Sequence, residues 1–423
     1  MIRSMYAAVS GLRNHQTMMD VVGNNIANVN TTGFKSSNTV FEDVLSQTLR
    51  GAGRAGANTG GTNPAQIGLG ASVAGVTTNF SQGAPQLTGR GTDLAITGDG
   101  FFIVDQGGER LFTRSGAFTL DTLGRLVSQN GGIVQGWPAD ANGQFNPNGP
   151  VRPLVVPVGD VIAPVQTSTS VLGGNLPADA AVGTTVATSI DVYDGQGRQT
   201  TVRYELTKTA ADTWSVGYRY VDDAGVQQPT PPAAASAVTG GPLTFDANGE
   251  LTSGYALTIP GGTIPGFAAG DDITISLGAA SAPARITQFG SLSTAAALDQ
   301  NGSAAGSLQS FSIGQDGLVT GSYSNGLTRS LGQLALASFT NPEGLEKRGG
   351  STFGATAASG AVNIGQAGQG GRGLLSSGTL EMSNVDLSTE FTNLILAQRG
   401  FQANSRVVTT SDEMLQEVVN LKR

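Results

Sequence analysis

The two ends of this chain carry helical apolar patterns, and the long segment between them does not. Between residues 2 and 29, apolar side chains recur at spacings of 3, 4 and 7, at Met5, Val9, Leu12, Met19, Val22 and Ile26. Towards the C-terminus the spacing is close to a heptad, at Leu387, Phe391, Leu394, Phe401, Val408, Leu415 and Val419. We therefore predict one long helix at each end of a chain whose middle folds differently.

Local signals mark the ends of the two predicted helices. Residues 30–33, with the sequence NTTG, form a stop signal for the first helix. Ser383 and Asp386 have the spacing of a capping box before the second helix. Lys422 and Arg423 would complement the negative end of its dipole.

Two arrangements of the helices are open at this point. They form an antiparallel hairpin within one monomer, or they pack mainly against copies from neighbouring subunits, because an isolated apolar stripe would be left in water. In the second arrangement polar Gln16, Gln398 and Asp412 would help to fix the register. The side chains expected at the assembly interface are Leu12, Val22, Ile26, Phe391, Leu394, Phe401 and Leu415.

The middle of the chain, from about residue 66 to residue 359, has the pattern of short strands. Runs rich in Val, Ile, Thr and Phe alternate with glycine-containing turns, for example at residues 101–104, 118–120, 200–206 and 273–277. One turn type recurs, with Asp at the first position and Gly at the fourth, beginning at Asp121, Asp140, Asp194 and Asp246. Aspartate can accept hydrogen bonds within such a turn and glycine adopts positive φ, so we predict hairpins. Each turn has too few carboxylates for a calcium loop.

The composition argues against most enzyme chemistry. The 423 residues include no cysteine and one histidine, and charged residues make up 13%, about half of the usual ~25%. Disulfides and thiol nucleophiles are thereby excluded. The formal charge of −8 argues against nucleic-acid binding. We expect no catalytic residues, no cofactor and no metal.

No segment is apolar enough to span a bilayer, so no membrane insertion is expected. The N-terminal stretch does not resemble a secretory signal, because Arg13, Asn14 and His15 interrupt it where its apolar core would continue. We expect a chain that is either cytoplasmic or exported without a cleaved signal peptide.

Several candidate motifs have simpler interpretations. His15 has no second histidine or cysteine to share a metal with, which favours a solvated or interface role. Residues 51–56 and 368–373 match G-x-G-x-x-G, but the first follows a helix-like stretch at residues 41–50 and the second opens no helix. Both are expected to be flexible connectors. The neighbouring acids Asp222–Asp223 and Asp271–Asp272 would point to opposite faces of a strand.

Composition shifts predict nested domains. Glycine-rich residues 51–61 and 360–373 lie at matching distances inside the two helices, and prolines cluster near residues 147–157. We expect a helical inner domain (1–30 and 384–423), a connector (31–70 and 360–383), an inner β-domain (71–145 and 286–359) and an outer β-domain (146–285). The fold class is mixed and mainly β, with the terminal helices paired as a coiled-coil-like inner layer.

Three ordered blocks carry a family resemblance. Residues 10–35 resemble the N-terminal signature of bacterial flagellar rod and hook axial proteins, with Asn24, Asn25, Asn28, Thr31 and Gly33 in its asparagine-rich turn. Residues 89–104, which include Gly98, Gly100 and Phe101, resemble a second characteristic block of this family. Residues 379–421 resemble its C-terminal helix.

The resemblance implies a structural role in the bacterial flagellum. The long segment between residues 146 and 285 favours the hook members of the family over the distal rod members. Such subunits polymerise into a curved, flexible tube that acts as a universal joint and transmits torque from rod to filament for cell motility. The implied partners are copies of the chain, the rod, the hook cap, the hook–filament junction proteins and the type III export apparatus, and the implied location is the extracellular hook above the basal body. Distal rod subunit and, in another class, extracellular adhesin are the alternatives.

Overall fold

The computed structural model describes residues 2–54, 60–140, 142–222, 224–229, 234–278 and 285–420. The chain divides into two compact units. The first comprises Met1–Val158, Phe311–Gly321 and Arg329–Arg423, and the second comprises Gly159–Ser310 and Ser322–Thr328. Within these described ranges, no helix combines the length and the hydropathy that crossing a membrane requires.

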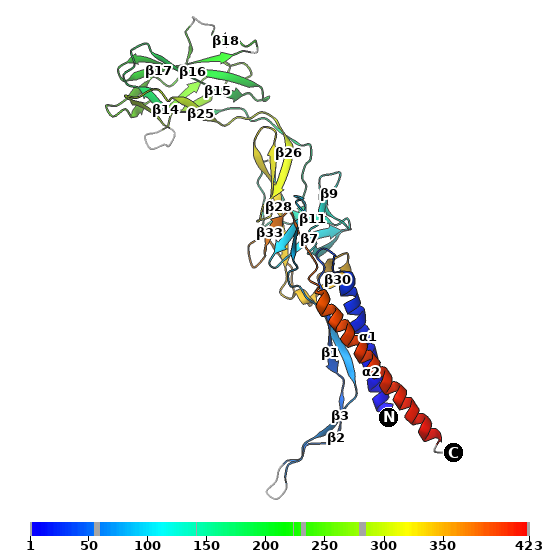
Figure 1. Ribbon diagram of the computed structural model, residues 1–423. Helices are drawn as coiled ribbons and strands as arrows, with labels where there is room; N and C mark the ends of the chain where they lie inside the picture. Colours follow the sequence, from blue (N-terminus) through cyan, green and yellow to red (C-terminus); the bar gives the residue numbers. More distant parts are fainter. Residues whose placement is uncertain are drawn as a thin grey trace. The chain divides into compact units, whose positions relative to one another are not determined.

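Both ends of the chain are helical, as predicted. Helix α1 (Ile2–Ala27) and helix α2 (Leu387–Asn420) pack side by side in antiparallel directions (Figure 1). Asp386 caps α2 directly, since its Oδ1 accepts the backbone N–H of Ser388 at 2.8 Å. The capping box expected with Ser383 is wrong in detail, because Ser383 Oγ accepts the N–H of Val385 instead. Lys422 and Arg423, proposed to complement the helix dipole, lie outside the described residues.

A long two-stranded hairpin follows α1 and lies against it. Strand β1 (Ser37–Asp43) pairs with β4 (Ala71–Thr78), and β2 (Ser46–Arg50) pairs with β3 (Ala65–Gly68). The helix-like expectation for residues 41–50 is therefore wrong, because pairing with residues 65–78 outweighs local propensity. The glycine-rich stretch 51–61 lies at the end of this hairpin, where Gly53 bridges Thr62, rather than linking two domains. Its residues 55–59 are outside the described part.

The rest of the first unit is a β-domain built on one sheet. Its path runs β28-β11-β7-β8-β31-β30, with β9, β10, β12, β29 and β32 attached beside it, while β33 pairs with β6 and β34 with β5. The bounds are β5 (Pro85–Leu87), β6 (Leu94–Thr97), β7 (Phe101–Gln106), β8 (Glu109–Thr113), β9 (Phe118–Leu120), β10 (Leu126–Ser128), β11 (Ile133–Pro138), β12 (Arg152–Pro153), β28 (Thr328–Leu334), β29 (Leu336–Ser338), the 3-10 helix η1 (Pro342–Gly344), β30 (Glu346–Gly349), β31 (Thr352–Gly354), β32 (Asn363–Gly365), β33 (Leu374–Ser377) and β34 (Thr379–Glu381).

Aromatic and aliphatic side chains fill the core of this β-domain. One cluster contains Phe101, Ile103, Phe112, Trp137, Ala335, Ala337, Leu345 and Phe353. The second glycine-rich stretch, residues 360–373, packs on the domain: β32 pairs with β29, and a Cβ on Gly373 would lie 2.3 Å from the carbonyl oxygen of Thr97. This close approach, and not freedom to swing, explains the glycine at that position.

The second unit holds two sheets around one core. One sheet runs β15-β16-β17-β20-β21 and the other β22-β23-β14-β24. The bounds are β13 (Val161–Ile162), β14 (Thr169–Pro177), β15 (Thr185–Tyr193), β16 (Gln199–Ala210), β17 (Thr213–Val221), β18 (Gln227–Gln228), β19 (Ser236–Ala237), β20 (Leu243–Phe245), β21 (Leu251–Ser253), β22 (Ala256–Ile259), β23 (Ile273–Ser276), β24 (Ile286–Phe289) and β25 (Ala296–Gln300). Strands β26 (Gly306–Ile313) and β27 (Leu318–Tyr323) contain residues of both units. Trp214, Tyr204 and Leu206 are fully buried between the sheets.

The second unit begins and ends later in the chain than the outer domain expected from the sequence, because its long segment is Gly159–Ser310 and not residues 146–285. Strands β24 and β25 both pair with β14 and so belong to it, although the expected boundary was residue 285. The two ends of the unit are tied together: Val161 pairs with Ser307, and Val165 bridges Ser303. Chain entry and chain exit are thus neighbours.

The recurring Asp-x-x-Gly turns form as predicted. In each turn an aspartate Oδ1 accepts backbone N–H groups two and four residues further on; for Asp246 these come from Asn248 at 2.9 Å and Glu250 at 2.8 Å. Gly249 in this turn has φ of 77°, which explains the glycine. The turns at Asp121, Asp194 and Asp246 close the hairpins β9–β10, β15–β16 and β20–β21. The turn at Asp140 lies in the longer connection between β11 and β12.

Candidate functional site

The seam between α1 and α2 depends on glycine. A Cβ on Gly11 would lie 2.7 Å from Asn404 Nδ2, and a Cβ on Gly400 would lie 2.4 Å from the ring of His15. Ala397 on α2 is completely buried. Because these positions carry little or no side chain, the helix backbones approach closely and polar side chains of one helix fit over small residues of the other.

The predicted interface residues are divided between the seam and the surface. Val22 is buried, while Leu12, Ile26, Leu394 and Leu415 are half-buried. Phe391 and Phe401 retain 51% and 37% of their surface exposed. The polar residues expected to set the register of the helices, Gln16, Gln398 and Asp412, are all exposed. The buried polar residues of the two helices are instead Asn14, Asn25, Glu390 and Ser411. The helices approach each other along small residues such as Gly11 and Gly400, and this line of contact does not coincide with the line of large apolar residues.

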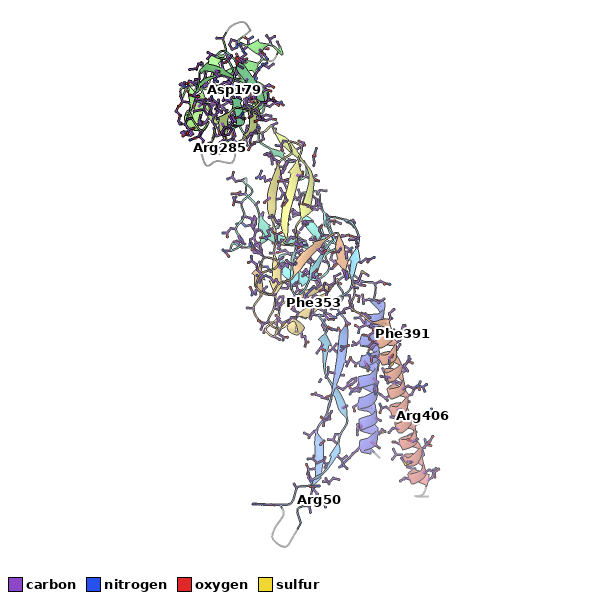
Figure 2. The ribbon with its side chains drawn as sticks, turned by 60° about the vertical axis from the view of Figure 1, so that its left-hand side comes forward. Arg50, Asp179, Arg285, Phe353, Phe391 and Arg406 are labelled. Carbon is purple, nitrogen blue, oxygen red and sulfur yellow. The ribbon has the colours of Figure 1, made fainter. Side chains whose placement is uncertain are left out.

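Large apolar side chains remain exposed along α2 and the hairpin. On α2 these are Leu387, Phe391, Ile395, Leu396, Phe401, Val407, Met414, Val418 and Val419. On the hairpin they are Val40, Phe41, Val44, Leu45, Leu49, Ile67, Leu69 and Val76. Figure 2 shows Phe391 near the start of α2 and Arg50 near the far end of the hairpin. We call these two groups the apolar surface; an extended surface of this kind normally marks a contact with another protein.

The asparagine-rich turn joins α1 to both α2 and the hairpin. Asn25 Nδ2 donates to Ser37 O at 2.8 Å and to Glu390 Oε1 at 2.9 Å, and Asn25 Oδ1 accepts the N–H of Ser37 at 3.0 Å. Burial raises the pKa of Glu390, against the effect of the Asn25 hydrogen bond. Asn28 donates to Asn24, and Thr31 donates to Asn28 Oδ1, so the other asparagines of the motif stabilise the turn itself.

Next to this turn lies a buried group of charges. Lys35 Nζ is 2.5 Å from Glu381 Oε1, and Arg114 Nη1 is 3.5 Å from Glu381 Oε2. All three side chains are at most 3% exposed. The N–H of Gly33 donates to the carbonyl oxygen of Glu381 at 2.8 Å. Gly33 has φ of 67° and lies against Ser115, so a side chain there would meet the backbone.

The second motif block reaches the same charged group from the other side. Arg114 donates to Gly98 O at 2.8 Å and lies over the ring of Phe101, 5.3 Å from its centroid. Phe101 in turn contacts the rings of Phe80 and Phe339. Gly100, at φ of 130°, allows the chain to turn into β7. Blocks that lie far apart in the sequence therefore meet at Arg114 and Glu381.

Two hollows flank this junction. One, of about 330 Å³, is lined by Asp99, Phe101, Arg114 and Phe339 among others. The second, of about 290 Å³, lies between the asparagine-rich turn and the β30–β31 hairpin. Lys347 lines the second one, where burial lowers its pKa and its Nζ donates to Ser37 Oγ at 2.7 Å. No metal-binding group of three or more His, Asp or Glu side chains occurs in the part of the chain that the structure describes.

Sequence reasoning missed the charged residues of the junction. Lys35, Arg114 and Glu381 lie inside or beside the blocks that carry the family resemblance. A signal was available, since charges are scarce in this chain and apolar blocks that retain them are candidates for buried ion pairs. His15 packs against Gly400 and lies 6.1 Å, centroid to centroid, from the ring of Phe41, consistent with the interface role expected for it.

Family comparisons match four parts of the chain. Residues 5–35 match the model described as flagella basal body rod protein, and residues 376–421 match flagellar basal body rod FlgEFG protein C-terminal. Residues 95–187 match the flagellar hook protein FlgE/F/G D1 domain, and residues 166–303 match the flagellar basal body protein FlaE D2 domain.

Whole-length relatives agree with these matches. The chain is 40% identical to the flagellar hook protein FlgE of Treponema pallidum and 41% identical to that of Borreliella burgdorferi, in both cases over 100% of each chain. The crystal structure of Helicobacter pylori flagellar hook protein FlgE2 superimposes with a TM-score of 0.54 at 15% identity, covering 70% of this chain and 100% of that one. At that identity the likeness supports the fold alone.

Proposed function

The chain belongs to the flagellar hook protein family, and we propose that its helix pair and hairpin are the surfaces through which its copies build the hook. As a member of that family it is a structural subunit of the flagellar hook, not an enzyme. Neither the distal rod nor the adhesin alternative is favoured. The contacts that hold the polymer together must then come from surfaces that the single chain leaves uncovered.

The observation that carries the proposal is the apolar surface. Phe391, Ile395 and Leu396 are each more than half exposed, although they stand on a helix whose other face is packed. Each such side chain would contribute about 0.8–1.5 kcal/mol if a neighbouring subunit buried its remaining exposed half, which is about half of the value for full burial. Burial in the polymer therefore offers a driving force that the single chain lacks.

The predicted interface residues have different roles in this proposal. Phe391 and Phe401 contact neighbouring subunits, while Val22 and the half-buried Leu12, Ile26, Leu394 and Leu415 hold the helix pair together and contribute their remaining surface. Contacts of this head-to-tail kind that do not close into a ring generate a helical tube. We propose nested radial layers for that tube, with the helix pair and the hairpin in place of the separate inner and connector layers, and with the outer layer extended beyond residue 285 to include β24 and β25.

Bending requires that subunits change their spacing on each rotation. We propose that the β-domains slide over one another, which a charged fraction of only 13% favours because few ion pairs would hold one register. Residues 360–373, expected to be a flexible connector, pack on the β-domain of the first unit, so we do not place the bending motion there.

Further partners are suggested by the family. We propose that the rod, the hook cap and the hook–filament junction proteins bind the assembled hook, and that the type III export apparatus delivers the chain to the cell exterior without signal-peptide cleavage. The absence of cysteine supports this route, since an unfolded chain without thiols cannot form disulfides during passage.

Alanine substitution on α2 tests the assembly proposal. Phe391→Ala should raise the concentration needed for polymerisation by about 4- to 12-fold, which corresponds to the burial free energy given above. Sedimentation would measure the polymer, and electron microscopy would record whether curved tubes form. The melting temperature of the monomer should fall slightly, because about half of the Phe391 side chain is already buried in the single chain.

Gln398→Ala is the matched control on the same helix, since Gln398 is exposed but polar. It should polymerise like the unaltered chain. Equal critical concentrations for Phe391→Ala and Gln398→Ala would contradict the proposed role of the apolar surface.

A further inference from the structure

The carboxylate of Glu381 contacts groups from three separate stretches of the chain. Its Oε1 accepts from Lys35 Nζ at 2.5 Å and from the N–H of Gly83 at 2.9 Å, while Oε2 faces Arg114 Nη1 at 3.5 Å. The side chain is 1% exposed and stands at the end of β34. The stretch after α1, the stretch before β5 and the end of β8 therefore meet on a residue that precedes α2.

The stretch after α1 depends on the C-terminal segment for its backbone hydrogen bonds as well. Gly33 N–H donates to Glu381 O at 2.8 Å, and Ser36 N–H donates to Asn384 Oδ1 at 2.8 Å, across 348 positions of chain. Asn384 Nδ2 donates in turn to Asn79 O at 2.8 Å. The segment at residues 33–36 is thus held by partners from the far end of the sequence.

The buried charges of Lys35 and Arg114 make the stretch after α1 depend strongly on Glu381. Burial lowers the pKa of Lys35 and of Arg114, and the attraction of Glu381 opposes this effect for both. Asp99 also attracts Arg114, but Glu381 is the carboxylate that Lys35 contacts. A lysine buried without its counterion is strongly unfavourable, so Lys35 would leave its site before it stayed there unpaired.

We propose that Glu381 is a positioning residue that makes docking of the N-terminal segment on the β-domain conditional on the C-terminal segment. Until residue 381 is in place, Lys35 has no counterion and only the carbonyl oxygen of Ser81, at 2.7 Å, to accept from its Nζ, so the end of α1 stays undocked. Once Glu381 arrives, the two ends of the chain dock together, and the helix pair acquires a fixed connection to β8. This coupling acts within the single subunit, and it operates whether or not the apolar surface drives polymerisation.

A double-mutant cycle on the full chain tests this coupling. Glu381→Met should speed amide hydrogen exchange at residues 24–37 and 79–84 by about 100-fold or more, because it removes the carboxylate from both Lys35 and Arg114. Lys35→Met leaves Glu381 paired with Arg114, so its effect should be smaller. The double variant should exchange more slowly than Glu381→Met alone, since it no longer contains a buried lysine without a carboxylate. Additive effects of the two substitutions would overturn the proposal, as they would indicate only lost packing.

A milder variant covers the case in which Glu381→Met fails to fold. Glu381→Gln keeps the shape and an acceptor for Gly83 but removes the charge, so it should show the same local loss of protection while Trp137 fluorescence reports a folded β-domain. Unchanged exchange in Glu381→Gln would overturn the proposal. Glu346→Gln is the control, because Glu346 forms an exposed ion pair with Arg348 in the same unit and should leave exchange at residues 24–37 unaltered.

Discussion

The second unit and the terminal helix pair solve the problem of burying apolar surface in opposite ways. The second unit closes two sheets on one core, in which Trp214, Tyr204 and Leu206 are fully buried. The helix pair buries mainly small and polar residues and leaves Phe391 and its neighbours exposed. The core of the second unit is complete within one chain. In the assembly that we propose, other copies cover the exposed face of the helix pair, so the stability of the pair should depend on subunit concentration.

The largest expected effect lies in the self-contained unit. Leu206→Ala should lower the free energy of unfolding of the second unit by about 2–5 kcal/mol, because it leaves a cavity in a closed core. The chain has two tryptophans, Trp214 in this unit and Trp137 in the first. Denaturant titrations of Trp137→Phe and Trp214→Phe backgrounds would follow each unit separately, and only the Trp214 transition should move.

Leu292→Ala is the control in the same unit, since Leu292 is 88% exposed. It should change stability by no more than about 0.5 kcal/mol. If Leu206→Ala shifted both tryptophan transitions equally, the two units would unfold as one and the comparison would fail.

A smaller effect is expected in the helix pair, where two glycines have opposite surroundings. Gly400→Ala would place a Cβ 2.4 Å from His15, and it should destabilise the pair by about 1–3 kcal/mol through overpacking. Gly23→Ala meets no atom within 4 Å and should stabilise α1 by up to about 1 kcal/mol. Circular dichroism melting of the helices measures both. Equal responses of the two variants would show that the close approach at Gly400 does not hold the pair together.

The smallest effects concern pH, and they should have opposite signs in the two regions. Backbone hydrogen bonds, first from Glu250 and then from Asn248, lower the pKa of Asp246, so its contribution to stability is present above the unfolded value of about 3.9 and is lost as pH falls through the folded pKa. Burial raises the pKa of Glu390, so its contribution is present below about 4.3 and is lost as pH rises through the folded pKa.

Amide substitutions would separate these two contributions. At pH 7, Asp246→Asn should lower the melting temperature of the second unit, and Glu390→Gln should raise or preserve that of the helix pair. Both differences should vanish in acid, below the lower pKa of each group. The same sign for both variants at pH 7 would contradict the assignment of opposite pKa shifts.

The sequence predicted the structure best where interactions between neighbouring residues decide it. The helices at residues 2–27 and 387–420 and the turn at Asp246 arise from local chemistry, and the structure has them where they were expected. The sequence failed where distant pairing decides the outcome. Residues 41–50 resemble a helix but become strands because residues 65–78 pair with them.

The site shows the same limit. Spacing along α2 predicted Leu394 and Leu415. It could not show that the two helices pack along small residues such as Gly11 and Gly400, on a different line from the large apolar side chains. Nor could any spacing bring together Lys35, Arg114 and Glu381, which lie on three separate stretches of the chain. The resemblance marked the right blocks without indicating which side chains meet.

The pairing of entry and exit strands in the second unit has a consequence for evolution and for engineering. Because Val161 pairs with Ser307 and Val165 bridges Ser303, the long segment between residues 165 and 303 begins and ends at two neighbouring points of the chain. This segment can be lengthened, exchanged or removed, because the rest of the chain would still have two adjacent ends to join. A foreign domain with closely spaced termini could take its place, and the hook would then carry a cargo of choice on its subunits.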